Sequence, residues 1–155
     1  MDRDVQPPEP PAQLLATARE VTPGWIRRIT HQAAAAGGFG VEASGPALEA
    51  MVDSESVQLV EALRRLLATD VDLQRTNPLS LFRDAVAGPT AFLRSVGVPP
   101  APSDPFVTER FPDDVYGLGP AAWADIDPRL HEPGLTWGAW KAMTVLRRRR
   151  DEGLR

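Results

Sequence analysis

The sequence predicts an all-α fold: a single-domain, irregular helical bundle of about five or six helices. Apolar residues recur three and four positions apart almost everywhere, and no segment shows the sustained apolar and polar alternation of a half-buried strand. The chain has 155 residues, 43% hydrophobic and 25% charged, which is a single-domain length with ordinary globular composition. Its sixteen prolines confine long helices to two proline-free windows and predict a mostly loop-like segment before the last helix.

Composition divides the chain into three parts. Residues 1–11 are rich in proline and predict a flexible leader. Residues 12–146 carry the helical patterns and form the predicted domain. Residues 147–155 read RRRRDEGLR and predict a basic helix end or tail.

The first part of the domain predicts two helices. One runs over residues 12–21, and TPGW then places Thr22 as a cap and Pro23 in the first turn of the next helix, where proline is favoured. This second helix buries Trp25 and Ile29 and stops at the glycine pair 37–38.

The most regular pattern begins near Ser44, a predicted N-cap, and continues for about six turns. Glutamate and aspartate lie early in this helix and arginine lies late, which complements the helix dipole, and Glu61 precedes Arg65 by four residues. The predicted core residues share one face: Leu48, Val52, Leu59, Leu63 and Leu66.

Two short helices are predicted next. Asn77 caps a helix that begins at Pro78 and ends at Gly88, and a second runs from Pro89 to Gly97. The inward residues are Leu79, Phe82 and Val86 in the first helix, and Phe92, Leu93 and Val96 in the second.

Prolines interrupt residues 99–133 so often that we expect loops and single helical turns wrapped around the body. Large apolar side chains anchor this segment in the prediction: Phe106, Phe111, Tyr116 and Trp123.

The last helix is predicted to follow Pro133. Its apolar stripe, widened by Trp140, is expected to face the core, with Leu146 as the last core residue. The stripe consists of Leu135, Ala139, Ala142, Met143 and Leu146.

Several classes of protein are excluded or disfavoured. The chain contains no cysteine, so disulfides, thiolate metal sites and cysteine nucleophiles are excluded. We expect no cofactor, because no phosphate-binding loop is present, and no GxSxG motif indicates a serine-hydrolase nucleophile. The acidic, proline-rich start is unlike an export signal, and no apolar run is long enough for a membrane span, so the expectation is a cytoplasmic protein without membrane contact.

Charge is distributed unevenly along the chain, whose net charge is −4. Residues 103–132 hold seven acids and two bases, a net of −5, whereas residues 133–155 hold six bases and two acids, a net of +4. Sixteen of the seventeen bases are arginine, which indicates a GC-rich coding bias and weakens any single arginine as a sign of bidentate recognition.

The terminal arginines, Arg147, Arg148, Arg149 and Arg150, are the first candidate binding residues. Four successive helical residues sweep 300° of the circumference, so the helix must project beyond the body or fray there. The arginines are expected to dock on the acidic 103–132 segment or remain solvated, or else to bind an acidic protein surface. Nucleic acid is a weaker expectation because the whole chain is acidic.

Trp137 and Lys141 are the second candidates. Trp137 lies one turn before Trp140, and an exposed indole with a nearby ammonium can stack on a partner's aromatic ring or a base. Burial in the core is the competing interpretation, and it is favoured more for Trp140 than for Trp137.

A third candidate is a metal site in DIDPRLHEPG. Asp125, Asp127, His131 and Glu132 offer ligand types suited to a divalent cation. Their spacing matches neither an EF-hand loop nor an HExxH helix, and turn formation at the two prolines accounts for most of the pattern.

These observations favour a non-catalytic interaction or accessory module that acts through its C-terminal helix. The alternatives are an accessory protein that binds nucleic acid or ribonucleoprotein through the terminal arginines, and a metal-dependent enzyme that uses residues 125–132. The sequence does not indicate an oligomeric state.

Overall fold

The computed structural model describes residues 9–39, 45–100, 111 and 113–153. It confirms the all-α, single-domain bundle, and the described residues contain no strand. The elements are α1 (Pro10–Ala36), α2 (Gly45–Ala68), α3 (Leu79–Asp84), α4 (Ala87–Ser95), α6 (Trp123–Ile126), the 3₁₀ turn η2 (Pro128–Leu130) and α7 (His131–Gly153). The predicted leader, residues 1–11, lies mainly outside the described residues, although α1 already begins at Pro10.

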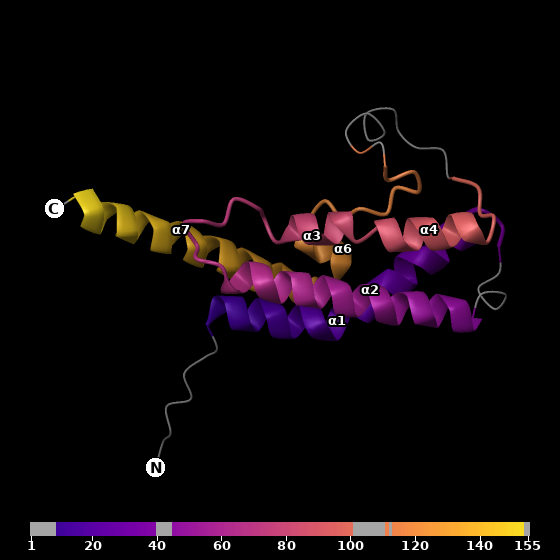
Figure 1. Ribbon diagram of the computed structural model, residues 1–155, viewed down its shortest axis with the longest axis horizontal. Coiled ribbons are helices and arrows are strands. Elements are labelled where there is room, and N and C mark those ends of the chain that lie inside the picture. Colours follow the sequence, from indigo (N-terminus) through magenta and orange to yellow (C-terminus); the bar gives the residue numbers. More distant parts are fainter. Residues whose placement is uncertain (1–8, 40–44, 101–110, 112, 154–155) are drawn as a thin grey trace, which may run out of the picture.

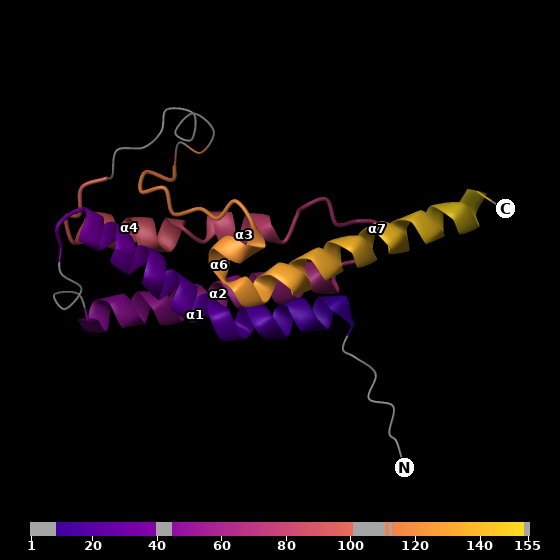
Figure 2. The same cartoon turned by 180° about the vertical axis from the view of Figure 1, so that it is seen from behind.

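The prediction of two helices in residues 12–36 is wrong, because α1 is one 27-residue helix with Pro23 inside it. Proline removes one backbone hydrogen bond and bends a helix, and α1 changes direction near its middle (Figure 2). The Thr22 hydroxyl donates to the carbonyl of Ala18 at 2.5 Å, a bond that also favours bending. Burial of Val21 and Thr22 before the bend and of Trp25 and Ile26 after it stabilises the helix across the bend.

Helices α1 and α2 run antiparallel and form the base of the bundle (Figure 1). The prediction for α2 is confirmed in its main features: Leu48, Val52, Leu59 and Leu63 are buried. Glu61 pairs with Arg64 at 2.6 Å and with Arg65 at 3.4 Å. The predicted cap, Ser44, lies outside the described residues.

Helices α3 and α4 lie against this pair (Figures 1 and 2). Asn77 caps the first turn as predicted, since its Oδ1 accepts from the Leu79 amide at 3.0 Å. The boundary between the two helices differs from the prediction: α3 ends at Asp84, and Gly88 lies within α4. Val96 is exposed rather than buried, because the chain turns at Gly97 with φ +81° and directs Val98 into the core.

The described part of the proline-rich segment is packed against the body. Tyr116 and Trp123 are buried as predicted, but Phe111 is exposed and Phe106 lies outside the described residues. Two arginines hold the segment: Arg83 donates to the carbonyl of Pro120 at 3.0 Å, and Arg28 donates to that of Ile126 at 2.6 Å.

A row of aromatic rings joins this segment to the core. Trp25, Phe82 and Trp123 meet edge to face, with centroid distances of 5.6 and 5.7 Å. Gly134 of α7 lies against the outer ring, so closely that a Cβ atom there would be 2.4 Å from Trp123 Cδ1. The row therefore continues from α1 through α3 and α6 to the start of α7.

No helix in the described ranges combines the length and the apolar character that crossing a membrane would need.

Replacing Gly134 with alanine is expected to destabilise the protein by about 1–3 kcal/mol, because the methyl group would overlap the Trp123 ring. Gly138 is the matched control one turn later: a Cβ there meets no atom within 4 Å, and alanine should stabilise the helix by about 0.5–1 kcal/mol. Urea unfolding of both variants measures the difference, and equal responses would contradict the close contact.

Replacing Glu55 with glutamine is expected to raise stability at neutral pH. Burial raises the pKa of Glu55, whose carboxylate faces Gly88 of α4, so ionisation costs more free energy in the folded chain than in the unfolded chain. Glutamine removes this cost at pH 7, and its advantage should vanish below the ordinary glutamate pKa of about 4.3. Thermal unfolding at both pH values tests this; a gain that is the same at both would contradict it.

Candidate functional site

Helix α7 carries most of the predicted site residues. The helix follows η2, whose first amides are fixed by Asp127: its Oδ1 accepts from the Arg129 amide at 2.8 Å. From there α7 packs on α1, η2 and α6. Its C-terminal turns extend past the ends of α1 and α2 (Figures 1 and 2), so the helix projects beyond the body, as the arginine geometry required.

The inner face of α7 consists of Pro133, Gly134 and Trp137, all buried. Trp137 is only 5% exposed, and its indole Nε1 is buried without a hydrogen-bond partner in the described part of the chain. Trp140 is half-buried. The prediction of Trp137 as an exposed binding platform therefore does not match its position, because the ring contributes to the core.

Lys141 lies beside Trp137, and its ammonium contacts other groups of the same chain. Its ammonium lies 5.4 Å from the centre of the Trp137 ring, a cation–π geometry. The same Nζ donates to the carbonyl of Gln74 at 2.8 Å. Lys141 thus ties α7 to the loop after α2, and it is not presented to a partner.

Arg148 ties α7 to the same loop two turns after Lys141. Its Nη1 pairs with the carboxylates of Asp70 and Asp72, the latter at 2.9 Å. The pKa of Asp70 is lowered, first by the hydrogen bond from the Asp72 amide and then by Arg148. The loop itself is held because Gln74 Nε2 donates to the carbonyls of Leu66 and Thr69.

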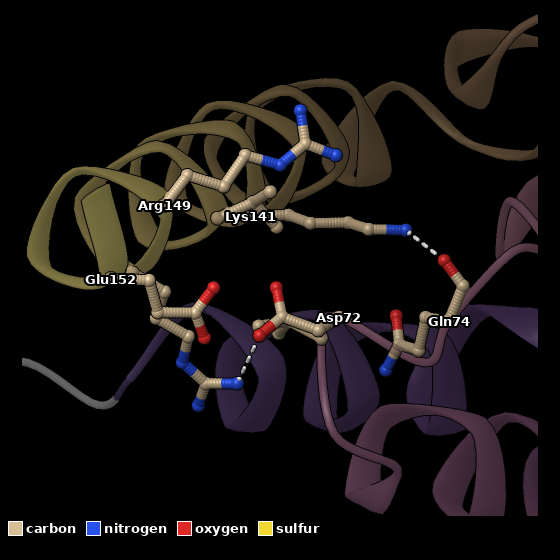
Figure 3. A pocket seen from close by; sticks show the side chains of 8 residues that line it. Asp72, Gln74, Lys141, Arg149 and Glu152 are labelled. Atoms are coloured by element: carbon tan, nitrogen blue, oxygen red, sulfur yellow. Dashed lines mark hydrogen bonds and ion pairs between the residues drawn. The ribbon is translucent and has the colours of Figure 1, made fainter. Parts of the chain in front are cut away.

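A polar groove of about 420 Å³ lies between α7 and this loop. Figure 3 shows Lys141, Arg149 and Glu152 on the helix side and Asp72 and Gln74 on the loop side. Charges of both signs line the groove, and most of its polar groups already serve the contact between helix and loop. We therefore interpret the groove as part of the attachment of α7.

The apolar stripe of α7 lies on the outer face of the helix, whereas the sequence predicts that it is buried. The stripe expected in the core is exposed, with Leu135 at 58%, Met143 at 54% and Leu146 at 63% of their full exposure. Ala139 and Ala142 of the same stripe are also exposed. The prediction that Leu146 is the last core residue is wrong, because Trp137 is buried in the core while Leu146 is exposed.

The outer stripe is defined here as Leu135, Ala139, Ala142, Met143 and Leu146. It spans three turns of helix, and no charged side chain interrupts it: the single charged residue between Glu132 and Arg147 is Lys141, which points to the groove (Figure 3). The stripe is an apolar surface that α7 leaves uncovered.

The arginine collar, residues 147–150, lies at the end of the stripe and is helical throughout. Arg148 docks on Asp70 and Asp72 rather than on the predicted acidic segment 103–132. Within the described ranges, no ion pair links Arg147, Arg149 or Arg150 to a carboxylate. Three cations of the collar are therefore presented to solvent.

The residues proposed as metal ligands serve local structure. Asp125 Oδ2 accepts from the amides of Ala121 and Ala122, each at 2.9 Å. Asp127 caps η2 and pairs with Arg129 at 3.2 Å, and the pKa of Asp127 is lowered first by the hydrogen bond from the Arg129 amide. His131 and Glu132 are exposed at the start of α7. The residues that the structure describes contain no group of three or more histidines and carboxylates arranged to hold a metal ion.

Three further residues of this site, Asp70, Asp72 and Gln74, were not predicted from the sequence. The available signal was the sequence TDVDLQ directly after a long helix. Two aspartates in such a short loop indicate pairing with a basic side chain. The pairing with Arg148 spans 78 positions and follows only from the way α7 packs.

No protein-family model matches the chain, and the searches of curated proteins and of solved structures found no significant match either.

Replacing Arg148 with methionine should raise the pKa of Asp70, since it removes a cation that stabilises the carboxylate. Amide exchange should also become faster in the loop of residues 69–74. NMR titration of the aspartate carboxyl carbons and hydrogen exchange measure these effects. The matched control is Arg147→Met, one residue earlier, which should leave both unchanged; a similar shift in both variants would contradict the assigned pairing.

Proposed function

We propose that this protein is a non-catalytic interaction module whose binding surface is the outer stripe of α7 together with the exposed arginines of the collar. The partner it fits is a helical protein surface with an apolar stripe and carboxylates near one end. The single observation that carries the proposal is the exposure of Leu135, Met143 and Leu146 in one uncharged line.

Exposed apolar side chains are common singly, but a contiguous row indicates an interaction surface. Each large side chain of the stripe would gain about 1.5–3 kcal/mol on full burial. Helix-to-helix docking through such rows, with anchors at i, i+4, i+7 and i+11, is a recurring mode of recognition. The spacing from Leu135 to Leu146 follows that pattern.

Packing within the chain does not account for the stripe. The inner face, with Gly134 and Trp137, already attaches α7 to α1 and α6. Lys141 and Arg148 attach the same helix to the loop after α2. Because these contacts all lie on the opposite side of the helix, the apolar composition of the stripe supports a role outside the fold.

The collar supports an acidic partner over other classes. Arg147, Arg149 and Arg150 are exposed directly after the stripe, where they would meet carboxylates at the end of a docked helix. Nucleic acid ranks second, since Asp72 and Glu152 line the same groove as Arg149 and would repel phosphates. The metal-dependent enzyme is not carried further, because residues 125–132 form no ligand cluster.

A photo-crosslinking residue at Ala139 tests the proposal in cells. We expect an adduct in which the linked peptide of the partner forms an amphipathic helix with a carboxylate near one end of its apolar stripe, and loss of that adduct when Leu146→Glu is added. Leu146→Glu should change stability little, because the residue is exposed.

The matched control places the crosslinker at Val57, an apolar residue of α2 that is 71% exposed. The same adduct from Val57, or an Ala139 adduct that survives Leu146→Glu, would contradict the stripe as the binding surface. An adduct of Ala139 with nucleic acid would favour the second-ranked function.

A further inference from the structure

We infer that the outer stripe binds a second copy of this chain, so that two α7 helices pair antiparallel about a two-fold axis. The inference rests on the proposed function, since it names the partner of the same surface. It follows from the order of apolar and charged residues along the exposed face of α7.

Six exposed residues of α7 are spaced alternately three and four positions apart. At 100° per residue they fall within a sector of about 100° on the helix, and the drift of about 20° per heptad is small over this length. The line reads, in order, Glu132, Leu135, Ala139, Ala142, Leu146 and Arg149. It therefore has an acid at one end, four apolar residues in the middle and a base at the other end.

This line is complementary to itself when a second copy runs in the opposite direction. With the two-fold axis between residues 140 and 141, Leu135 faces Leu146 of the second copy, and Ala139 faces its Ala142. Glu132 then faces Arg149 of the second copy, and the symmetry repeats that pair at the other end. A two-fold interface requires such self-complementarity.

The charges also select the direction of the pair. In a parallel pair, Glu132 would face Glu132 of the second copy and Arg149 would face its own equivalent, and both like-charge contacts are unfavourable. The antiparallel pair replaces both repulsions with attractions. In the described ranges neither Glu132 nor Arg149 forms an ion pair within its own chain.

The shape of the molecule permits this pairing. The apolar centre of the line lies on the side of α7 opposite to Trp137, so the two bodies would lie on opposite sides of the helix pair. Arg149 lies at the edge of the line that borders the groove, and its long side chain reaches Glu132 of the second copy from there. The C-terminal turns project past the body (Figures 1 and 2), which lets each collar lie beside the start of the other α7. Alanines at the centre allow the two backbones to approach closely, and leucines fill the space on either side.

The length of the contact between the two α7 helices limits the affinity of the dimer. From Glu132 to Arg149 the helix rises about 26 Å, and one helix pair of this length lies at or below the lower end of stable interfaces, which bury about 1,200 Å². The dimer is therefore expected to be micromolar and to exchange rapidly.

Sedimentation equilibrium from low-micromolar to submillimolar concentration tests the inference. The wild-type chain should pass from monomer to dimer, and Leu146→Glu should remain monomeric with unchanged helix content. Glu132→Arg and Arg149→Glu should each weaken the dimer by roughly tenfold, since each turns two attractions into two repulsions. Arg94→Glu, the same charge change at an exposed position of α4, is the control and should leave the dimer intact.

Mixing the two charge variants gives the sharpest result. Glu132→Arg presents two bases and Arg149→Glu presents two acids, so an equimolar mixture should form a heterodimer tighter than either variant alone. The double variant, which carries both changes in one chain, should recover dimerisation close to that of the wild type.

Four outcomes overturn the inference. A dimer that Leu146→Glu leaves intact uses another surface, and charge variants without mutual rescue contradict the antiparallel register. A strictly monomeric wild type that still shows the stripe-dependent adduct at Ala139 overturns the dimer but leaves the proposed function standing. A monomeric wild type without that adduct overturns both.

Discussion

The contact between Gly134 and the Trp123 ring determines how the last third of the chain is arranged. Trp123 is held edge to face against Phe82, which is held in the same way against Trp25. Such aromatic pairs contribute about 0.5–1.5 kcal/mol each beyond the area they bury, so the outer ring is a fixed surface. Helix α7 can lie on it only through a residue without a side chain, and Gly134 is that residue.

The rotation of α7 about its own axis follows from this contact. Once Gly134 meets Trp123, Trp137 is directed inward one turn later, and Lys141 and Arg148 then reach the loop after α2. Leu135 and Leu146 lie on the other side of the helix, together with the alanines between them. Exposure of an apolar stripe is therefore the consequence of a steric requirement in the core, and it creates the surface on which the proposed function depends.

A helix was predicted well where its sequence carries one apolar face, and poorly where two signals in the sequence conflict. In α2 the apolar residues form a single face, so periodicity alone identifies Leu48, Val52 and Leu63 as core. In α1 the local signals at Thr22 and Pro23 predict a new helix, but burial on both sides of the bend outweighs the loss of one hydrogen bond. In α7 either of two faces could be buried, and periodicity does not show which. The choice depends on the fit of Gly134 against the Trp123 ring, which the sequence pattern does not reveal.

The sequence predicts which helix carries the candidate site, but it does not predict the contacts that the single residues of the site form. Charge distribution and the terminal arginines point to the C-terminal helix, yet Trp137 and Lys141 are occupied inside the fold, and Arg148 pairs with a loop far away in sequence. Those assignments depend on tertiary contacts that no local pattern encodes. Hydroxyl-radical footprinting of the dilute, monomeric chain measures the orientation of α7 most directly: Leu135, Met143 and Leu146 should be modified rapidly while Trp137 and Leu130 are protected. Rapid modification of Trp137 with protection of Leu146 would contradict it.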